Sequence, residues 1–488
     1  MRKFFASILA IIFAFLVVTG VLLYRDGVDF SEVNLNTVKG VWSGLIPEFD
    51  EDDEIKITEV NVPKPEPEQN LTYNERIEKG DYYFDRGFLT FASNEYVKAA
   101  NLEPKRIEPY IKLLKTNYEL GDYGKAQLNA EIILEMNPNH YETRYDLARV
   151  YIKQSEFENA QSILNGLELP DTPDSRVTYY KGLLQIVFDN HDEGKKLLKQ
   201  AKADSIDPEL DGRIDILLDA YTEYEFAKAA DELYLSELLA RAYNKVKEYE
   251  MAIYKLKNIL RTRSDLRDAW VLFGFAYLNL ESYYFALSAF EKAYELDSEW
   301  PTTQYFLGLT YAELGNTNDA IIYFNYALSN NFEPALVIHQ KLADLYLDVE
   351  DYTKAVGSYE DVLDLNNEDI NSFVRPIWIY IDFLNQPAEA LKIAEVAAST
   401  FPENAMSYNL LGWSQTGTQE YENAEKNLKK AIELDPNLPA AYYNLGKLYE
   451  IQRRTDLALD VYQKAYELDQ NGSIGNLAAK AYNALLTE

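Results

Sequence analysis

The residue types that perform chemistry in enzymes and metal sites are few and scattered in this chain of 488 residues. There is no cysteine, which excludes disulfides, thiolate zinc sites, iron–sulfur clusters and cysteine nucleophiles. His140, His191 and His339 each have no second histidine nearby, and we interpret them as surface or packing residues. Phosphate-binding loops, dinucleotide glycine fingerprints and His-Glu-x-x-His zinc helices do not occur. We therefore predict no catalytic residue, no metal site and no cofactor.

The chain is strongly acidic, with a formal net charge of −33. A surface of this sign repels phosphate backbones, so nucleic acid is not an expected partner. The acidity can be explained by solubility alone, and the alternative explanation is a specific cationic partner. Because 47% of the residues are apolar, an ordered core is expected rather than a disordered chain.

An uncharged run of 21 residues, Phe4–Tyr24, follows Arg2 and Lys3. A helix of this length spans roughly 30 Å, the thickness of one hydrocarbon core. No small-x-small cleavage site is evident near its end, which favours a retained membrane anchor over a cleaved secretory signal. The positive charges precede the run, which favours a cytoplasmic N-terminus and an extracytoplasmic remainder. Residues 1–25 are therefore predicted to be a transmembrane signal-anchor.

Residues 26–70 lose this hydrophobic pattern and become acidic and proline-rich. The acidic run Asp50–Glu54 is followed by Pro63, Pro65 and Pro67. Like charges repel and proline blocks helix, so we interpret the segment as an extended spacer. An acidic docking motif and a calcium site are the alternatives, although the alternating ligands and turn glycine of a calcium loop are missing.

Alanine recurs along the rest of the chain at intervals that are nearly all 34 or 35 residues. This period predicts a stack of repeated helical hairpins, in which each unit packs on its neighbours. The recurrent alanines are Ala92, Ala126 and Ala160, and then Ala252, Ala286, Ala320, Ala355, Ala390, Ala424 and Ala458.

Residues 268–298 illustrate one such unit, with amphipathic helices predicted at 269–280 and 284–296. Gly274 and Ala286 are small because the two helices must approach closely there. Phe290 and Tyr277 are large because they fill the space to the next hairpin. Two short helices are marginal in water, so stacking is required to bury the second apolar face.

These residues resemble the pattern of the tetratricopeptide repeat (TPR) family, from about Tyr73 onward. The resemblance implies an all-α fold, a right-handed α-solenoid of about eleven helical hairpins. The one N-terminal transmembrane helix, predicted from the uncharged run, would precede it. Two units carry Leu114 and Trp378 where the first helix has its small residue. In the other units the small residue is Gly80, Ala148, Gly182, Ala240, Gly274, Gly308, Ala343, Gly412 or Gly446.

Breaks in the period divide the repeat region. About four units are expected over 71–208 and about seven over 233–472, separated by an irregular helical insert at 209–232. Pro376 falls within a first helix and is expected to kink it. Residues 473–488 are predicted to form a helix that caps the last open face.

The TPR resemblance implies a concave groove that receives an extended peptide or a helix. Tyr305 and Tyr443 remain open to the alternative that they pack against the neighbouring hairpin. The complete set of residues that clamps a C-terminal carboxylate in some TPR domains is not found. The groove residues that the resemblance implies are Lys115, Arg149, Arg241, Phe275, Tyr305, Leu309, Asn409, Trp413, Tyr443 and Lys447.

The sequence therefore predicts a membrane-anchored, non-enzymatic scaffold whose TPR groove binds peptide or helical segments of envelope proteins. The expected location is the cell membrane, with a single pass and an extracytoplasmic TPR domain. The alternatives are a cytosol-facing TPR assembly factor and a regulatory subunit of an enzyme complex. Homo-oligomerisation is left open.

Overall fold

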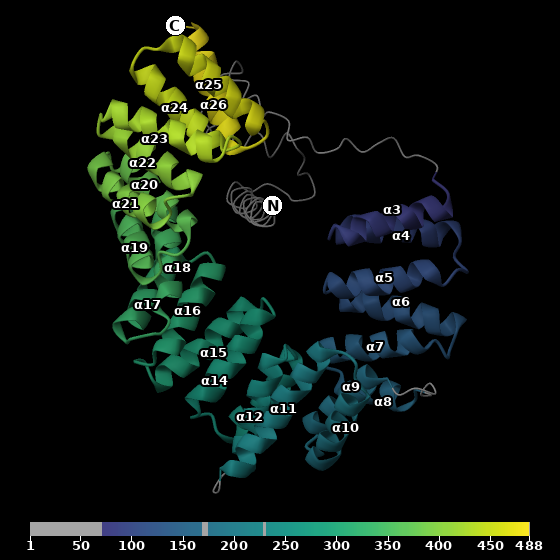
Figure 1. Ribbon diagram of the computed structural model, residues 1–488. Helices are drawn as coiled ribbons and strands as arrows, with labels where there is room; N and C mark the ends of the chain where they lie inside the picture. The colour runs from purple at the N-terminus through teal and green to yellow at the C-terminus, as the bar shows by residue number, and fades with distance from the viewer. Residues whose placement is uncertain (1–70, 168–173, 228–230, 488) are drawn as a thin grey trace, which may run out of the picture. The chain divides into compact units, whose positions relative to one another are not determined.

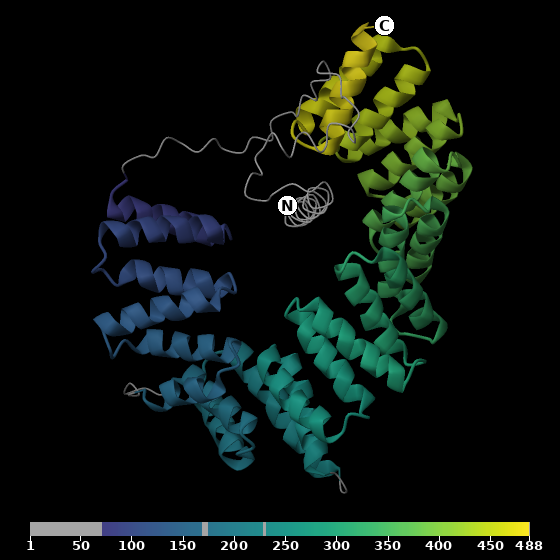
Figure 2. The same cartoon turned by 180° about the vertical axis from the view of Figure 1, so that it is seen from behind.

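In the computed structural model the described residues are 71–167, 174–227 and 231–487. Within these ranges the chain forms 24 α-helices, a short 3-10 helix and a short π-helix, and no β-strand. The helices follow one another as antiparallel pairs (Figures 1 and 2). The predicted transmembrane signal-anchor (1–25) and spacer (26–70) lie outside the described residues.

Four hairpins come first, and a single long helix follows them. The hairpins are α3 (Tyr73–Asp85) with α4 (Leu89–Leu102), α5 (Glu108–Glu119) with α6 (Tyr123–Met136), α7 (Tyr141–Lys153) with α8 (Phe157–Asn165), and α9 (Ser175–Val187) with α10 (His191–Asp204). The single helix is α11 (Pro208–Phe226).

The second series of hairpins runs from α12 to α25, and a last helix, α26 (Ser473–Thr487), closes the chain. The helices are α12 (Glu232–Lys245), α13 (Tyr249–Thr262), α14 (Arg267–Asn279), α15 (Tyr283–Leu296), α16 (Pro301–Glu313), α17 (Thr317–Ser329), α18 (Ala335–Asp348), α19 (Tyr352–Leu365), η2 (Ile370–Phe373), α20 (Val374–Trp378), η3 (Ile379–Phe383), α21 (Pro387–Thr400), α22 (Ala405–Gly417), α23 (Tyr421–Leu434), α24 (Pro439–Ile451) and α25 (Thr455–Leu468).

Where the first helix of a hairpin carries glycine at the small position, that glycine nests against a large residue of the second helix. A Cβ atom placed on Gly274 of α14 would lie 2.6 Å from the Phe290 ring on α15, so no side chain fits there without displacing the ring. Phe290 is fully buried and stacks on Phe306 of α16, with ring centroids 5.2 Å apart. One aromatic ring thus links the two helices of a hairpin to the next hairpin.

The turns between paired helices place one residue in the left-handed region. Glu281 has a φ of 56°, and the Ser282 amide donates to the Tyr277 carbonyl at 2.9 Å. Gly87, Gly121 and Gly315 hold comparable turn positions, where glycine adopts positive φ without a Cβ clash. These short turns keep the paired helices antiparallel and close.

The region predicted as an irregular insert, 209–232, contains the greater part of α11, which has no antiparallel partner of its own. Ile214, Leu217 and Tyr221 on α11 are buried. The next hairpin, α12–α13, packs directly on the units before α11: Lys153 of α7 pairs with Glu250 of α13 at 3.0 Å, across 97 residues of sequence. The break in period therefore coincides with contacts between hairpins that are not neighbours in the sequence.

Pro376 interrupts a first helix, as the sequence predicts. The segment is divided into the 3-10 helix η2, the short α-helix α20 and the π-helical η3. Since proline has no amide hydrogen and its ring crowds the preceding turn, a continuous α-helix is disfavoured there.

The last helix, α26, packs on the final hairpin through Ala478, which is fully buried, and through the partly buried Ala481, Tyr482 and Leu485. Leu477 is 46% exposed, so the buried face of α26 is narrower than the apolar pattern indicates.

None of the helices within 71–167, 174–227 and 231–487 combines the length and the apolar character needed to cross a membrane. The candidate span Phe4–Tyr24 lies outside these ranges, so the membrane anchor stays a prediction.

Candidate functional site

A cavity of about 470 Å³ lies among the first helices of consecutive units, α5, α7 and α9, and the single helix α11. We call it the Arg149 pocket. Its lining is Phe84, Leu114, Lys115, Tyr118, Glu119, Glu142, Tyr145, Asp146, Arg149, Arg176, Tyr179, Tyr180, Asp207, Glu209, Leu210 and Arg213. Five helices, α3, α5, α7, α9 and α11, therefore contribute side chains to one recess, including the sequence-predicted residues Lys115 and Arg149.

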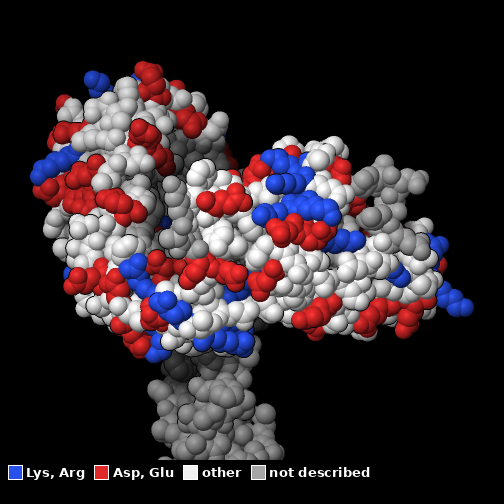
Figure 3. Space-filling model, turned by 90° about the horizontal axis from the view of Figure 1, so that it is seen from below, with Lys and Arg blue, Asp and Glu red and all other residues white. Residues whose placement is uncertain are grey.

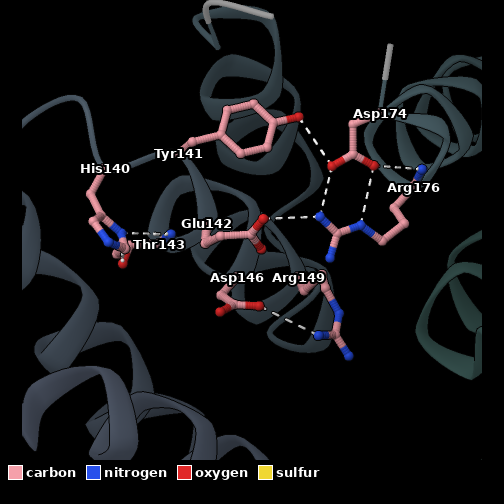
Figure 4. Close-up of polar contacts among 8 residues, drawn as sticks. All are labelled: His140, Tyr141, Glu142, Thr143, Asp146, Arg149, Asp174 and Arg176. Atoms are coloured by element: carbon pink, nitrogen blue, oxygen red, sulfur yellow. Dashed lines mark hydrogen bonds and ion pairs between the residues drawn. The ribbon is translucent and has the colours of Figure 1, made fainter. Parts of the chain in front are cut away.

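Arg149 lies over aromatic rings rather than against a well-formed carboxylate partner. Its guanidinium carbon is 4.5 Å from the Tyr118 ring centroid and 5.7 Å from that of Tyr145. Its nearest carboxylate is Asp146, with Nη1 and Oδ1 3.5 Å apart (Figure 4). A charge-assisted hydrogen bond is normally 2.7–2.9 Å, so this contact compensates the positive charge only in part. The buried Nε of Arg149 has no hydrogen-bond partner among the described residues.

Arg176, at the start of α9, is fully engaged by comparison. It donates to Asp174 at 2.7 and 3.1 Å and to Glu142 at 3.0 Å (Figure 4). Tyr141 also donates to Asp174, at 3.2 Å. Burial raises the pKa of Asp174, but the hydrogen bonds from Arg176 outweigh burial and hold that pKa below its usual value. Arg176 thus links α7 to the start of α9, and the two carboxylates already compensate its positive charge.

Arg213 brings the irregular helix α11 into the pocket. Its Nη2 donates to Glu248 at 2.6 Å and to the Val246 carbonyl at 3.2 Å, and its guanidinium carbon lies 5.1 Å from the centroid of the Tyr179 ring. Tyr179 is 1% exposed, and its hydroxyl makes no hydrogen bond within the described part of the chain. Burial raises the pKa of this hydroxyl more than the nearby Arg213 lowers it, so the hydroxyl stays protonated as a potential donor.

Tyrosine rings form much of the wall between these cations. Tyr145 and Tyr180 have ring centroids 6.0 Å apart, and Tyr179 and Tyr180 5.2 Å apart. Burial raises the pKa of Tyr145 to about 12, so these hydroxyls are neutral at physiological pH. With Phe84, Leu114 and Leu210, the rings supply apolar surface beside the polar groups, the combination typical of a recognition site.

Three exposed carboxylates, Glu119, Asp207 and Glu209, also border the pocket and form no ion pair with a described residue. Asp207 caps α11 by accepting from the Glu209 amide at 2.9 Å, and no described side chain forms an ion pair with its carboxylate. Acidic and basic side chains likewise lie next to one another on the face shown in Figure 3. The pocket therefore offers charges of both signs.

The remaining predicted groove residues do not join this pocket. Arg241 of α12 pairs with Glu237 one turn away, at 3.2 Å. Phe275 makes edge contacts with Phe306 and Tyr249, at centroid distances of 5.6 and 6.4 Å. Both side chains are partly buried, so each keeps some surface while it packs on neighbouring helices.

The aromatic residues of the later units are engaged mainly within the stack. Tyr305 stacks on Phe332 with ring centroids 4.4 Å apart, and Tyr443 lies 5.8 Å from Tyr462. Leu309 and Trp413 are partly buried against the hydrophobic core of their region. Tyr462 belongs to the same hairpin as Tyr443, and Phe332 directly follows the hairpin that contains Tyr305, so packing of these two tyrosines against the neighbouring hairpin stays a prediction.

Asn409 and Lys447 are satisfied by neighbouring side chains. Asn409 is only 2% exposed, and its amide oxygen accepts from Asn444 at 2.9 Å. This buried amide pair joins α22 to α24 and leaves Asn409 almost no surface for a partner. Lys447 pairs with Glu450 at 3.3 Å.

Sequence reasoning omitted Arg176 and Arg213 from the site. Arg176 lies six residues before the small residue Gly182, near the start of its helix rather than at the positions chosen for the groove. Arg213 lies on α11, outside the repeat register, so no positional rule applied to it. A search for cations one turn earlier in each first helix would have found Arg176 but not Arg213.

The three histidines have local roles. His140 caps α7 by accepting from the Thr143 amide at 3.3 Å, His191 shares a hydrogen bond with Tyr221 at 2.9 Å, and His339 lies 3.0 Å from Asp361. Among the described residues no group of three or more His, Asp or Glu side chains is arranged to hold a metal ion.

Family models match six stretches of the chain. Models described as tetratricopeptide repeat match residues 117–185, 268–299, 301–333, 339–369 and 439–471, and a model described as TPR repeat matches 418–452. The chain thus carries tetratricopeptide repeats, and its described part is an all-helical TPR solenoid.

Curated relatives are similar over less than half of the chain. Anaphase-promoting complex subunit 3 of Schizosaccharomyces pombe is 24% identical over 226 residues, which is 43% of this chain and 32% of the relative. Superkiller complex protein 3 of Mus musculus is 24% identical over 239 residues, 47% of this chain and 15% of the relative. The aligned region therefore spans less than a third of each relative.

Solved structures that match this chain include yeast Tom70, at 15% identity and a TM-score of 0.29, covering 85% of this chain and 96% of that one. The C-terminal part of a TPR repeat-containing protein from Cytophaga hutchinsonii has 14% identity and a TM-score of 0.39, covering 50% of this chain and 98% of that one.

Proposed function

We propose that this protein is a non-catalytic interaction scaffold whose TPR array binds a segment of another protein in the Arg149 pocket. The observation that carries the proposal is the convergence of α5, α7, α9 and α11 on one recess, where charged side chains, some of them incompletely paired, lie beside tyrosine rings and a few apolar side chains. Concave sites that combine hydrophobic or aromatic surface with polar groups that fix orientation are where proteins hold ligands. TPR repeats and similarity to subunits of multiprotein assemblies support a protein as the ligand.

We further propose that the scaffold is anchored in a membrane by its N-terminal segment. The apolar run Phe4–Tyr24 and the preceding Arg2 and Lys3 support a single-pass protein with its array outside the cytoplasm and envelope proteins as partners. Protease treatment of spheroplasts tests this topology: digestion of the array without lysis is expected. Protection of the array until lysis would instead favour the cytosol-facing assembly factor.

The binding role is tested by photo-crosslinking in cells. A photoreactive residue is placed at Glu119, on the rim of the pocket, or at Glu158, an exposed control position on α8 away from the pocket. The expected result is a crosslinked polypeptide from position 119 and none from position 158. The partner, once identified by mass spectrometry and purified, should bind the full chain directly. Equal crosslinking from both positions, or no direct binding, would refute the role.

A further inference from the structure

The Arg149 pocket contains unpaired charges of both signs in a defined arrangement. We propose that it selects a peptide segment in which a single carboxylate side chain is flanked by basic residues. This inference rests on the proposed function, because it names the chemistry of the segment that the scaffold would bind.

Two cations in the pocket lack a close carboxylate. Lys115 of α5 is exposed and forms no ion pair with a described residue. Arg149 of α7 approaches Asp146 no closer than 3.5 Å, and its side chain is 30% exposed. The other two cations differ, because Arg176 and Arg213 each hold a carboxylate within 3.0 Å. The cations available to a ligand are therefore Lys115, which forms no ion pair with a described residue, and Arg149, whose charge Asp146 compensates only in part.

The Tyr179 hydroxyl is an independent indication of a ligand in the same recess. Tyr179 lines the pocket and is 99% removed from solvent, and its hydroxyl proton has no acceptor among the described residues, because the nearby Arg213 can only donate. Buried polar groups in folded proteins are nearly always paired, so an unpaired hydroxyl beside a cavity indicates an acceptor that is supplied from outside. A carboxylate provides about four acceptor positions, enough for a cation and a further donor.

The rim of the pocket limits how much negative charge the ligand carries. Glu119, Asp207 and Glu209 are exposed and form no ion pair within the described ranges. A second carboxylate next to the first would face these groups and be repelled, whereas a lysine or arginine would pair with them. A polyanionic segment is therefore disfavoured, and a mixed-charge segment is favoured.

The charge of the whole chain acts in the same direction. With a net charge of −33, the protein attracts cationic segments and repels anionic ones beyond the range of direct contact. The local pair Lys115 and Arg149 then fixes the register of the bound segment through its one carboxylate. Leu114, Leu210 and Phe84 in the wall fit apolar side chains between the charged ones.

The test uses the full chain in detergent micelles and fluorescein-labelled peptides, with affinity measured by fluorescence anisotropy. The parent probe is Lys-Leu-Glu-Leu-Lys. Three matched probes replace the central Glu with Gln, both Lys with Gln, or both Lys with Glu. Loss of the charged hydrogen bond in the Gln probe is expected to weaken binding about tenfold or more. The two probes without basic flanks are expected to bind more weakly than the parent.

The variant Lys115→Gln tests whether the affinity difference between the Glu and Gln probes arises in the Arg149 pocket. Lys115 is exposed, so its replacement leaves the packing intact. The variant should lose affinity for the parent probe and show little change with the Gln probe, which is the coupling expected of a direct contact. Lys125→Gln on α6 is the matched control, because it removes the same charge from a lysine that is 70% exposed outside the pocket. Arg149→Gln is informative only if circular dichroism shows unchanged helicity, since Arg149 also packs on Tyr118 and Tyr145.

Equal affinity for the Glu and Gln probes would overturn the inference. Tighter binding of the probe in which both Lys are replaced by Glu would also overturn it. So would a loss of affinity in Lys125→Gln equal to that in Lys115→Gln. Failure of the parent probe to bind would overturn it too. Continued crosslinking of a partner from position 119 would then leave the proposed function standing, so the two ideas fail separately.

Discussion

The buried pair Lys153–Glu250 connects α7 to α13 and provides the sharpest test of how the array is held together at its break in period. The side chains are 18% and 6% exposed, and their charged atoms are 3.0 Å apart. Burial lowers the pKa of Lys153, but attraction to Glu250 and Glu248 outweighs burial and raises that pKa above its usual value. Burial raises the pKa of Glu250 in spite of Lys153. The lysine thus interacts with two carboxylates, while Glu250 has one cation.

This asymmetry predicts unequal effects of the two single substitutions. Lys153→Met leaves Glu250 buried and unpaired, and should cost about 3–5 kcal/mol, the range for removal of one partner of a buried pair. Glu250→Gln leaves Lys153 near Glu248, so the cost should be smaller, about 1–3 kcal/mol. The double variant Lys153→Met/Glu250→Gln should recover most of the loss, because no unpaired buried charge remains.

Hydrogen exchange measured by mass spectrometry is the appropriate assay, because long repeat arrays do not unfold in a single two-state step. Peptides from α7 and α13 should exchange faster in Lys153→Met, by a factor of about 100 or more for 3 kcal/mol. Peptides from α24 and α25 serve as the internal control and should not change. Equal effects of the two single variants, or an additive loss in the double variant, would refute the reasoning.

Further predictions concern the core, acid stability and the amide pair. Phe290→Ala should destabilise the local hairpins by about 3–5 kcal/mol, because it removes a fully buried ring, whereas Phe285→Ala, at a site 66% exposed, should cost under about 1 kcal/mol in the same urea titration. Burial raises the pKa of Glu425, but Arg454, Lys429 and Tyr449 outweigh burial and lower it from 4.5 to about 2. The stability contributed by the ionised Glu425 carboxylate is therefore present above about pH 4.5 and lost as the pH falls toward 2. The difference in stability between wild type and Glu425→Gln should shrink over that pH range. Acid titrations followed by circular dichroism measure this difference. Asn409→Leu should lower stability, measured by urea titration, by about 1–3 kcal/mol because it leaves the buried Asn444 amide without its acceptor, and a neutral result would show that Asn409 is free to serve a partner.

Much of the fold could be predicted from the sequence because the repeat imposes local rules. The spacing of small residues such as Gly274 and large residues such as Phe290 can be recognised along the chain, and Phe290 does reach the next hairpin through Phe306. The sequence did not predict that Phe290 also covers Gly274 within its own hairpin. The interruption at Pro376 follows equally from the chemistry of one residue. These features depend on contacts within a hairpin or between adjacent hairpins.

The site was predicted only in part, because its members come from outside the local pattern. Lys115 and Arg149 occupy the groove positions that the TPR resemblance implies, and both line the pocket. Asn409 occupies an equivalent position and is nevertheless buried against Asn444, a contact that its position in the helix alone does not reveal. Arg213 was missed because α11 follows no repeat register.

By itself the sequence determined the class of this protein: phased small and large side chains on successive helices leave stacked hairpins as the arrangement that buries both apolar faces. It also determined which chemistries are missing, since a chain without cysteine forms no thiolate site. Only the tertiary structure decided which charges are neutralised. Arg176 reaches Asp174 and Glu142, Arg213 reaches Glu248 from another unit, and Arg149 is left over aromatic rings. The reason is physical: electrostatic compensation depends on distances of a few ångströms between helices, and the packing of non-adjacent units fixes those distances.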